Sequence, residues 1–378
     1  MEFVSFEQAV EIWDTLRKPV NAKERQSRIE EKDIGELYPY YGATGQVGYI
    51  DGYISDGEYV LLGEDGAPFL QPTATKAYLI HGKAWVNNHA HVLRSKYNNA
   101  FLCYYLNSFD YQGFVSGTTR LKLTQAAMKQ IPIPAPPLSE QKHIVSRIEE
   151  LFSQLDASVA ELKTAKERLR VYRQAVLKEA FEKVKVHIPF GKIIDARLGK
   201  MLDKEKNTGN YRKYLRNINV RWFSFDLSDL LEMRIEDDEI EKYSVSHNDL
   251  IICEGGEPGR CAVWDKQDSI FYQKALHRVR FLDNSNPRFY MYYLWFSAQA
   301  GQLCRYFTGT GIKHLTGQSL SKVIVPTADR TIQDSIVAEI ESRLSVCDSI
   351  QKTVDTALQE AEALRQSILK KAFEGRLD

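Results

Sequence analysis

The most constraining feature of this chain is a long stretch that occurs twice. Residues 141–182 and 333–374 align without a gap at a constant offset of 192 positions, and 16 of the 42 aligned residues are identical. Neither copy contains Gly or Pro. Two stretches this similar, about half a chain length apart in a protein of 378 residues, indicate a duplicated unit.

Each copy is predicted to form one long helix, capped at its start by the hydroxyl of Ser139 or Thr331. Apolar side chains in the first copy recur at alternating steps of three and four residues, which is heptad spacing. This stripe, broken only by Ser158, consists of Ile144, Ile148, Leu151, Leu155, Leu162, Ala165, Leu169, Tyr172 and Val176. The second copy keeps the stripe but carries Arg343 and Cys347 at two of its positions. A narrow apolar stripe needs a partner helix, and the simplest partner is the other copy. The alternative is that each helix packs on its own neighbouring domain.

The segments before the two copies repeat more weakly. Residues 308–316 resemble residues 116–124 at the same offset of 192, and each helix follows a proline-containing hinge. We therefore divide the chain into four parts, two α+β segments that are each followed by a long helix: residues 1–136, 137–184, 185–327 and 328–378.

Within the first segment, residues 6–16 have a short amphipathic helical pattern, and the charged stretch that follows, to about residue 33, is expected to be an exposed loop. Residues 38–66 alternate aromatic and β-branched residues with Gly and Asp-Gly, which indicates short strands with tight turns. This stretch has no sequence counterpart in residues 211–221. The order of segments therefore repeats along the chain, but the sequences of the two α+β segments differ.

Composition limits the function without fixing it. The 50 basic and 50 acidic residues give a net charge of zero, and the five cysteines are odd in number and form no CxxC pair. No apolar run has transmembrane length and no secretory signal is apparent, so a cytoplasmic location is expected. Residues 197–222 nevertheless hold a local excess of six positive charges interleaved with Tyr211, Tyr214 and Trp222. Basic residues mixed with aromatics suit nucleic acids, although a solvated charged loop has the same composition.

Several motifs together resemble one known family. They are residues 40–45 (YYGATG), 86–90 (VNNHA), 248–261 (NDLIICEGGEPGRC) and 273–280 (QKALHRVR), with the Pro-Pro-Leu-Ser-Glu-Gln entry of the first helix and the Ala-Phe-Glu-Gly exit of the second. Across essentially the whole chain the sequence is similar to the specificity subunits of type I restriction-modification systems.

This resemblance implies two tandem α/β target-recognition domains, each followed by a long helix, with the two helices packed as an antiparallel coiled coil. Each domain would read half of a bipartite site in double-stranded DNA. The subunit itself would be non-catalytic and would hold no cofactor. It would position two methyltransferase subunits, which bind S-adenosylmethionine and methylate adenine, and restriction subunits are optional further partners.

Two loops that repeat are candidates for contacts with the DNA backbone. Each offers hydroxyls, backbone amides and cations, the groups that hold phosphates. The residues are Thr118, Thr119, Arg120 and Lys122 in the first loop and Thr310, Lys313 and His314 in the second. The alternative is that both loops are structural turns.

Other side chains are candidates for reading bases. Arg suits guanine, and Asn and Gln suit adenine, because each can form paired hydrogen bonds to a base edge. The candidates are Tyr40, Tyr41, Thr44, Gln46, Asn87 and Asn88 in the first segment and Arg212, Arg216, Asn217, Asn219, Arg221 and Arg260 in the second. Each has a structural role as its alternative, and Arg260 could pair with an internal carboxylate. His89 and His91 could form half of a metal site, but with no third ligand nearby a structural pair is the better interpretation.

Enzymatic motifs are missing from the sequence. There is no Gly-x-x-x-x-Gly-Lys-Ser/Thr phosphate loop and no Asn-Pro-Pro-Tyr or Asp-Pro-Pro-Tyr motif for amine methylation. The leading hypothesis is a DNA-specificity subunit. A coiled-coil adaptor that does not read DNA and an enzyme with an unrecognised site are the alternatives.

Overall fold

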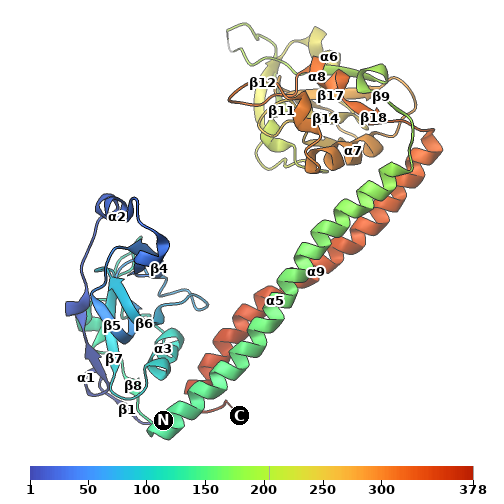
Figure 1. Ribbon diagram of the computed structural model, residues 1–378. Coiled ribbons are helices and arrows are strands. Elements are labelled where there is room, and N and C mark those ends of the chain that lie inside the picture. Colours follow the sequence, from blue (N-terminus) through green and yellow to red (C-terminus); the bar gives the residue numbers. More distant parts are fainter. Residues whose placement is uncertain (204, 378) are drawn as a thin grey trace. The chain divides into compact units, whose positions relative to one another are not determined.

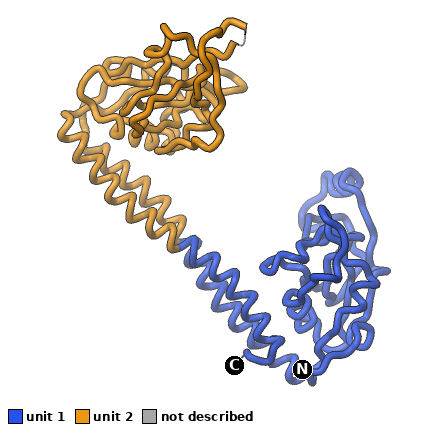
Figure 2. Tube along the Cα trace, turned by 180° about the vertical axis from the view of Figure 1, so that it is seen from behind, with its two compact units in different colours: residues 1–164, 354–378 blue, residues 165–353 orange. Residues whose placement is uncertain are grey.

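The computed structural model describes residues 1–203 and 205–377, so Lys204, part of the basic stretch, lies outside the described residues. By its contacts the chain divides into two compact units, coloured separately in Figure 2. Unit 1 comprises residues 1–164 and 354–378, and unit 2 comprises residues 165–353. Each long helix therefore contributes one part to each unit.

Unit 1 is built on a six-stranded sheet in the order β2-β7-β5-β6-β3-β4 (Figure 1). All neighbours pair antiparallel except β6 and β3, which are parallel. The helix α3 packs on this sheet over a core that includes Phe6, Leu62 and Leu106. The elements are β1 (Phe3–Val4), α1 (Phe6–Ala9), β2 (Val10–Ile12), the 3-10 turn η1 (Asp14–Leu16), α2 (Ala22–Ile29), η2 (Ile34–Glu36), β3 (Tyr38–Gly42), β4 (Gly45–Ile50), β5 (Ser55–Gly63), β6 (Ala77–Val86), β7 (Ala90–Ser95), α3 (Asn99–Ser108), α4 (Gln125–Met128) and β8 (Ile133–Pro134).

Unit 2 contains two four-stranded sheets, β10-β17-β14-β15 and β12-β11-β16-β13. The helix α7 packs on β14 and β15, and its aromatic residues fill the larger core. The elements are β9 (His187–Pro189), η3 (Phe190–Lys192), β10 (Ile194–Leu198), β11 (Asn210–Leu215), η4 (Asn217–Asn219), β12 (Leu231–Ile235), η5 (Asp237–Glu239), α6 (Ile240–Tyr243), β13 (Ser244–Val245), β14 (Leu250–Cys253), β15 (Cys261–Val263), β16 (Ile270–Tyr272), β17 (Leu276–Phe281), α7 (Pro287–Gln299), η6 (Leu303–Tyr306), α8 (Gly317–Lys322) and β18 (Ile324–Pro326).

The two units share a strand plan that their sequences conceal. In unit 1 the hairpin β3–β4 joins the sheet through a parallel pairing of β3 with β6. In unit 2 the hairpin β11–β12 joins through a parallel pairing of β11 with β16. The stretch 38–66 thus has a structural counterpart that begins at β11, which the sequence comparison missed because the side chains diverge while the pairing does not.

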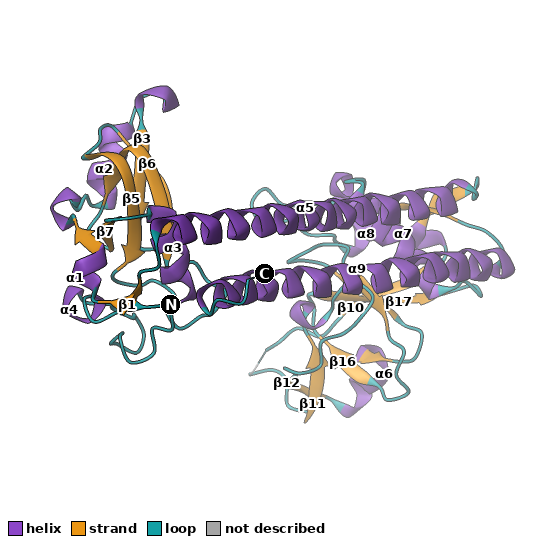
Figure 3. Ribbon diagram, turned by 90° about the horizontal axis from the view of Figure 1, so that it is seen from below, coloured by secondary structure: helices purple, strands orange, loops and turns teal. Residues whose placement is uncertain are grey.

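The helices α5 (Leu138–Glu182) and α9 (Arg330–Phe373) run side by side and antiparallel (Figures 1 and 3). Two equivalent ion pairs fix the direction. In unit 2 Arg173 pairs with Asp348 at 2.7 Å, and in unit 1 Arg365, which is 192 residues after Arg173, pairs with Asp156, which is 192 residues before Asp348. The predicted fold class, two β-rich domains with long helices that pack together, is confirmed.

The two interpretations of the apolar stripe both hold, at different places. Near the ends of the helices the stripe packs on the adjoining domain. Ile148 lies in a cluster with Phe101 of α3, and Leu177 and Ile340 lie in the core of unit 2. Farther from the domains the helices cover only each other, and Leu155, Leu162 and Ala165 are half-buried.

The polar interruption at Arg343 is matched on the other helix. The guanidinium of Arg343 pairs with Glu179 at 2.8 Å, donates from Nε to the hydroxyl of Tyr172 at 3.2 Å and lies 5.4 Å from the centre of its ring. At the equivalent positions of the other repeat stand Leu151 and Leu364. Two positions that hold leucines in one unit are therefore occupied by an arginine and a tyrosine in the other.

Three local predictions were wrong. Residues 6–16 form a four-residue helix followed by a strand and a 3-10 turn, and α2 lies within the stretch expected to be a loop. The long helices begin at Leu138 and Arg330, so Ser139 and Thr331 lie inside the first turn and are not caps. The following glutamines tie the helix starts instead: Nε2 of Gln141 donates to Pro136 O (2.9 Å), and Nε2 of Gln333 donates to Ala328 O (2.8 Å).

Candidate nucleic-acid interface

The predicted phosphate-binding loop of unit 1 is a closed hairpin. Ser116 and Lys122 exchange backbone hydrogen bonds of 2.8 and 2.9 Å. Gly117 has a φ of +94°, and a Cβ there would lie 2.4 Å from Arg120 O, so only glycine fits this turn. The loop is fastened to the end of β5, because the backbone N–H of Leu123 donates to Glu64 O at 2.8 Å.

Unit 2 builds the same loop. Thr308 and His314 exchange backbone hydrogen bonds of 2.8 and 2.9 Å, and the N–H of Leu315 donates to Glu254 O at 2.7 Å. Gly309 has a φ of +92°, and a Cβ there would lie 2.2 Å from Ile312 O. Both loops therefore present the same backbone at the end of an equivalent strand.

A groove of about 750 Å³ in unit 1 gathers five of the predicted residues. They are Thr44, Asn87, Thr118, Thr119 and Arg120, and the groove is also lined by Asp65, Gln71 and His89. Asn87 is held at its base, since its backbone N–H donates to Tyr41 O (3.0 Å) and its Oδ1 accepts from the N–H of His89 (2.8 Å). The amide nitrogen of Asn87 faces Gly42, where any side chain would crowd it. The groove brings hydroxyls, an amide and a cation together.

The cations at this groove are tethered by carboxylates. Nε of Arg120 lies 2.6 Å from Asp65, while the side chain is 60% exposed. Nζ of Lys122 lies 3.5 Å from Glu64. These partly exposed ion pairs are weak, so either cation can turn to a phosphate at little energetic cost.

The remaining candidates of unit 1 lie outside the groove. Tyr40 is buried, and its hydroxyl donates to Val20 O at 3.2 Å. Tyr41 stacks on Tyr78 with ring centres 6.0 Å apart, and burial, reinforced by Tyr49, raises the pKa of Tyr41. Gln46 and Asn88 are exposed. The two tyrosines thus stabilise the sheet. The two amides are accessible, although Nε2 of Gln46 donates to Gly48 O at 3.3 Å.

In unit 2 three of the candidates meet around the turn that follows β14. Nδ2 of Asn217 lies 3.5 Å from Gly255 O, and Arg260 donates from NH2 to Asn217 O at 2.9 Å. His314 forms a β-bridge with Gly255. Gly256 has a φ of +80°, as Gly66 has in the equivalent turn of unit 1. This turn occupies the place that the groove residues 65–66 occupy in unit 1.

Two arginines and one asparagine of unit 2 serve the fold. Asn219 is 2% exposed; its Oδ1 accepts from Arg216 and its Nδ2 donates to Asp226 O and Asp229 O at 3.0 Å. Arg216 also pairs with Asp229 at 2.7 Å. Arg260, as its alternative interpretation allowed, pairs with Glu257 at 2.7 Å.

Four candidates of unit 2 remain outside this scaffold. The guanidinium of Arg212 lies 5.6 Å from the ring of Phe271, and Arg221 is exposed with Asp226 at 3.6 Å. Thr310 and Lys313 are exposed on the loop, where Nζ of Lys313 donates to Gly309 O at 2.8 Å. Of these four, Arg221 and the two loop residues are placed to reach a ligand.

Comparison with known proteins identifies the family. The family model for the type I restriction modification DNA specificity domain matches residues 14–167. A type I restriction enzyme specificity subunit of Haemophilus influenzae is 28% identical over 378 aligned positions, which cover 96% of this chain and 92% of that protein. The EcoKI specificity subunit of Escherichia coli is 26% identical over 304 positions, covering 74% of this chain and 66% of that protein. The chain belongs to the type I specificity subunits.

Solved structures of such specificity subunits have the same fold. A chain from a structural study of complex assembly in the type I restriction-modification system matches with a TM-score of 0.74 at 16% identity, covering 99% of this chain and 98% of that chain. The HsdS subunit of Thermoanaerobacter tengcongensis matches with a TM-score of 0.56 at 16% identity, covering 99% and 97%. The specificity subunits are non-catalytic members of restriction-modification complexes and determine which DNA target is recognised. Among the residues that the structure describes, no helix is long and apolar enough to cross a membrane.

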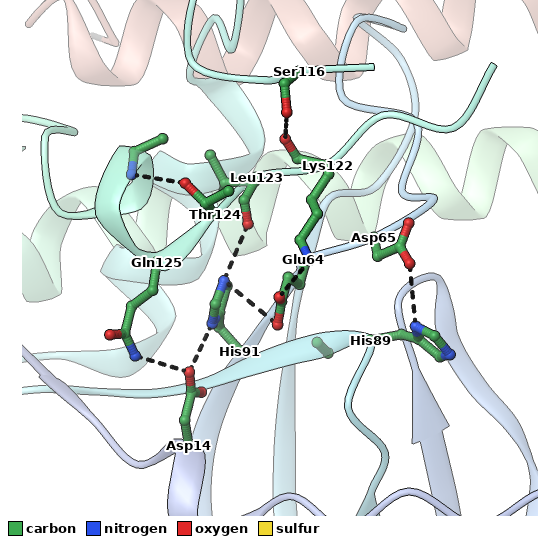
Figure 4. A network of polar contacts seen from close by, with 12 residues as sticks. Asp14, Glu64, Asp65, His89, His91, Ser116, Lys122, Leu123, Thr124 and Gln125 are labelled. Atoms are coloured by element: carbon green, nitrogen blue, oxygen red, sulfur yellow. Dashed lines mark hydrogen bonds and ion pairs between the residues drawn. The ribbon is translucent and has the colours of Figure 1, made fainter. Parts of the chain in front are cut away.

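Sequence reasoning missed the residues that hold the loops of this specificity subunit. His91 of β7 and His277 of β17 are each 1% exposed, and each contacts the backbone carbonyl that ends its loop (Figure 4 shows the first). His91 Nε2 lies 3.2 Å from Leu123 O, and His277 Nε2 lies 2.8 Å from Leu315 O. His91 was singled out as half of a metal site or a structural pair, and the structure places it as a loop anchor. Only an alignment of the two strands by their pairing, which the sequence does not show, would have brought the two histidines together.

Proposed function

We propose that each domain of this specificity subunit reads one half of an asymmetric, bipartite site in duplex DNA. The observation that carries the proposal is that the two units repeat one loop backbone. Both loops have the same backbone hydrogen bonds and a left-handed glycine at the same position, but the side chains around them differ. A shared backbone suits the phosphates, which are alike at every site, and different side chains suit different bases.

The frame suggests how the work is divided within each domain. The loops 116–122 and 308–314 hold phosphates through their exposed hydroxyls, cations and N–H groups. Thr44 and Asn87 in unit 1 and Asn217 in unit 2 read base edges, because they lie beside the loop and amide groups pair well with adenine. Tyr40 and Asn219 are buried and Arg216 is half-buried, and their polar side-chain groups are directed at internal partners, which excludes them from this role. The amide of Asn87, by contrast, lines the groove.

The helices α5 and α9 set the spacing of the two half-sites and dock two adenine-N6 methyltransferase subunits, which bring S-adenosylmethionine. Restriction subunits can join the same complex. The exposed apolar residues on the outer faces of the helices, Val171 (61% exposed) and Val346 (57% exposed), support a protein partner there, since they contribute nothing to the pairing of α5 with α9.

The first test is single-molecule sequencing for methylated adenine in cells that carry this gene and its methyltransferase gene, compared with a deletion of this gene alone. We expect an asymmetric two-part motif that disappears on deletion. A motif that survives deletion contradicts the proposal. Exchanging residues 38–50 for those of a relative with another target is expected to change one half of the motif and leave the other unchanged.

The salt dependence of duplex binding distinguishes the proposed function from that of an adaptor that does not read DNA. Phosphate contacts release counterions, so duplex binding by the purified complex is expected to weaken steeply with salt, by about 0.9 in log K per log unit of salt for each phosphate contacted. Mutation of Arg120 to Ala is expected to lower this slope by about one such contact. Binding that does not depend on salt supports the adaptor.

The spacing role is tested in the helices. Inserting four residues near Ala160 of α5, with a matching insertion near Ala361 of α9, lengthens the pair by about 6 Å and is expected to change the spacer between the half-sites. The letters of both half-sites should stay the same. New letters in either half-site contradict modular reading.

A further inference from the structure

Asn87, the proposed base reader of unit 1, stands in the turn between β6 and β7. Its backbone N–H donates to Tyr41 O on β3 at 3.0 Å, and the N–H of Glu64 donates to His89 O at 2.8 Å. Glu64 is also the residue to which the loop 116–122 is fastened. The position of Asn87 is therefore fixed by the parallel pairing on one side and by the end of β5 on the other.

The turn between β16 and β17 of unit 2 is built in the same way. The backbone N–H of Gln273 donates to Leu215 O on β11 at 3.1 Å, and the N–H of Glu254 donates to Ala275 O at 2.9 Å. Strand pairing thus places Gln273, 186 residues after Asn87, at the position of Asn87. The helices repeat at an offset of 192, so an alignment by the long repeat does not bring the two turns together.

A further backbone segment holds the turn of unit 2. The N–H of Lys200 donates to Tyr272 O, and the N–H of Lys274 donates to Lys200 O, both at 3.0 Å. Lys200 is itself 6% exposed, and its ammonium group forms ion pairs with Glu236 and Glu239. The backbone of the turn is therefore held from more than one side.

The side chains of this turn, unlike its backbone, are available. Gln273 is half-buried and Lys274 is exposed. Within residues 1–203 and 205–377, no residue forms a hydrogen bond with the side-chain amide of Gln273 or an ion pair with Lys274. The amide of Asn219, by contrast, is used by internal carbonyls. An unused amide can pair with a base edge, and an unused ammonium group can pair with a phosphate.

The two units place a cation on different elements. In unit 1 the loop carries Arg120 and the turn carries the neutral Asn88. In unit 2 the loop carries Ile312 at the equivalent position, and the turn carries Lys274. Ile312 is 73% exposed, so the fold does not require an apolar side chain there. Each unit thus presents one cation from these two positions.

We propose that the turn 273–275 is a DNA contact of unit 2, in which Gln273 reads a base edge and Lys274 holds a phosphate. The inference rests on the proposed function and adds to it a reader equivalent to Asn87. A side-chain amide forms paired hydrogen bonds with adenine, so Gln273 suits an adenine in the half-site of unit 2. The ammonium group of Lys274 is a point charge that suits a phosphate and carries no sequence information.

The reading role is tested by sequencing methylated adenine in cells that carry the methyltransferase gene and a variant of this gene. Gln273→Ala is expected to make one position of one half-site accept more than one base, and Asn87→Ala to do so in the other half-site. Gln267→Ala is the matched control and should leave all letters unchanged. Gln267 is an exposed glutamine in the loop after β15, which begins beside Leu250, at the opposite end of β14 from Glu254.

Duplex binding by the purified complex makes the same comparison without depending on methylation in cells. Discrimination between the target duplex and a duplex with a changed base at that position is expected to fall about 5- to 150-fold in Gln273→Ala, as loss of one paired contact to a base would. Gln267→Ala should keep the discrimination of the unaltered complex. An unfolding temperature equal to that of the unaltered chain shows that Gln273→Ala has folded.

The phosphate contact is tested by the salt dependence of duplex binding. Lys274→Ala is expected to lower the slope of log K against log salt by about 0.9, while the letters of both half-sites stay the same. Lys266→Ala, which removes an exposed lysine of the control loop, should leave the slope unchanged. Lys274→Asn combined with Ile312→Arg moves the cation to the loop, as in unit 1, and should return the slope to that of the unaltered complex.

The outcomes separate this inference from the proposed function. If Gln273→Ala leaves the letters and the discrimination unchanged while Asn87→Ala relaxes one half-site, the inference is overturned and the proposed function stands. Relaxation of the same half-site by both variants overturns the equivalence of the two turns, and an unchanged slope in Lys274→Ala overturns the phosphate contact. If the unaltered chain directs no two-part motif, the proposed function itself fails.

Discussion

The two predicted phosphate-binding loops have the same backbone but different surroundings. Gly117 and Gly309 adopt φ values of +94° and +92°, and both loops are tied to the end of a strand through the same two contacts. At the position where unit 1 carries Arg120, unit 2 carries Ile312. The loop anchor His91 of unit 1 also contacts the carboxylate of Asp14 at 2.8 Å, whereas the hydrogen bond of His277 in unit 2 goes to Leu315 O. After duplication the backbone geometry was kept wherever only glycine or a paired N–H would fit. The side chains changed wherever the sheet does not need them.

The largest expected difference between the units is in the loss of stability when a phenylalanine that both repeats contain is mutated. Phe181 is 4% exposed and contacts Phe289, Tyr293 and Phe296, whereas its equivalent Phe373 is only half-buried. Phe181→Ala is expected to destabilise unit 2 by about 3–5 kcal/mol, and Phe373→Ala to destabilise unit 1 by less. Calorimetry should show which transition moves. Equal effects would mean that the two ends of the helix pair are packed alike.

The next effect concerns the loop glycines and tests whether the shared backbone matters. Gly309→Ala forces a Cβ to within 2.2 Å of Ile312 O at a φ of +92°, and the strain of about 1–3 kcal/mol should open the loop and abolish methylation of the target. Gly117→Ala should do the same in unit 1. Gly311→Ala, two residues away with nothing within 4 Å of its Cβ, is the matched control and should be active. Activity in both strained variants would show that the loops need not be closed.

A smaller effect separates scaffold from reader among the asparagines. Asn219→Ala leaves the carbonyls of Asp226 and Asp229 without their donor and is expected to cost about 1–3 kcal/mol, seen in urea unfolding. Asn217→Ala and the exposed Asn88→Ala should leave stability within about 0.5 kcal/mol. If Asn219→Ala changed the target letters at unchanged stability, its assignment to the scaffold would be wrong.

The smallest effect is expected at the two equivalent ion pairs of the helices. In Arg173–Asp348 and Arg365–Asp156 the aspartates are exposed and the arginines are half-buried, and each pair is worth about 0.2–1 kcal/mol. Reversing one charge of a pair should lower the free energy of unfolding, and reversing both charges should restore it. A double-mutant cycle measures this coupling. A cycle with no coupling in either pair would leave the pairing of these helices to the apolar stripe and to the contacts of Arg343 with Glu179 and Tyr172.

The sequence was sufficient to predict the fold and insufficient to place the readers. The heptad stripe and its repeat predicted the paired helices, because a 3.5-residue period has few other solutions. The pairing of β11 with β16 stayed hidden, since residue type says little about which strands are neighbours. Arg216 and Asn219 had the chemistry of base readers, but that chemistry also satisfies backbone carbonyls, and only the internal hydrogen bonds of these side chains decide between the two uses. The helix caps failed because each helix begins one residue before the predicted capping residue, which therefore lies inside the first turn.

The pairing of Arg343 with Tyr172 bears on how chains choose their partners. Because duplication produces two helices with similar apolar stripes, α5 or α9 of one chain could also pair with the same helix of a second chain. If α9 met a second α9 in the same antiparallel register, Arg343 would face Leu364, and a guanidinium would lose the hydroxyl, ring and carboxylate that it has opposite α5. A single polar position of this kind selects one partner and register from many similar ones. The replacement of one leucine pair thus favours a molecule closed on itself over chains linked to one another.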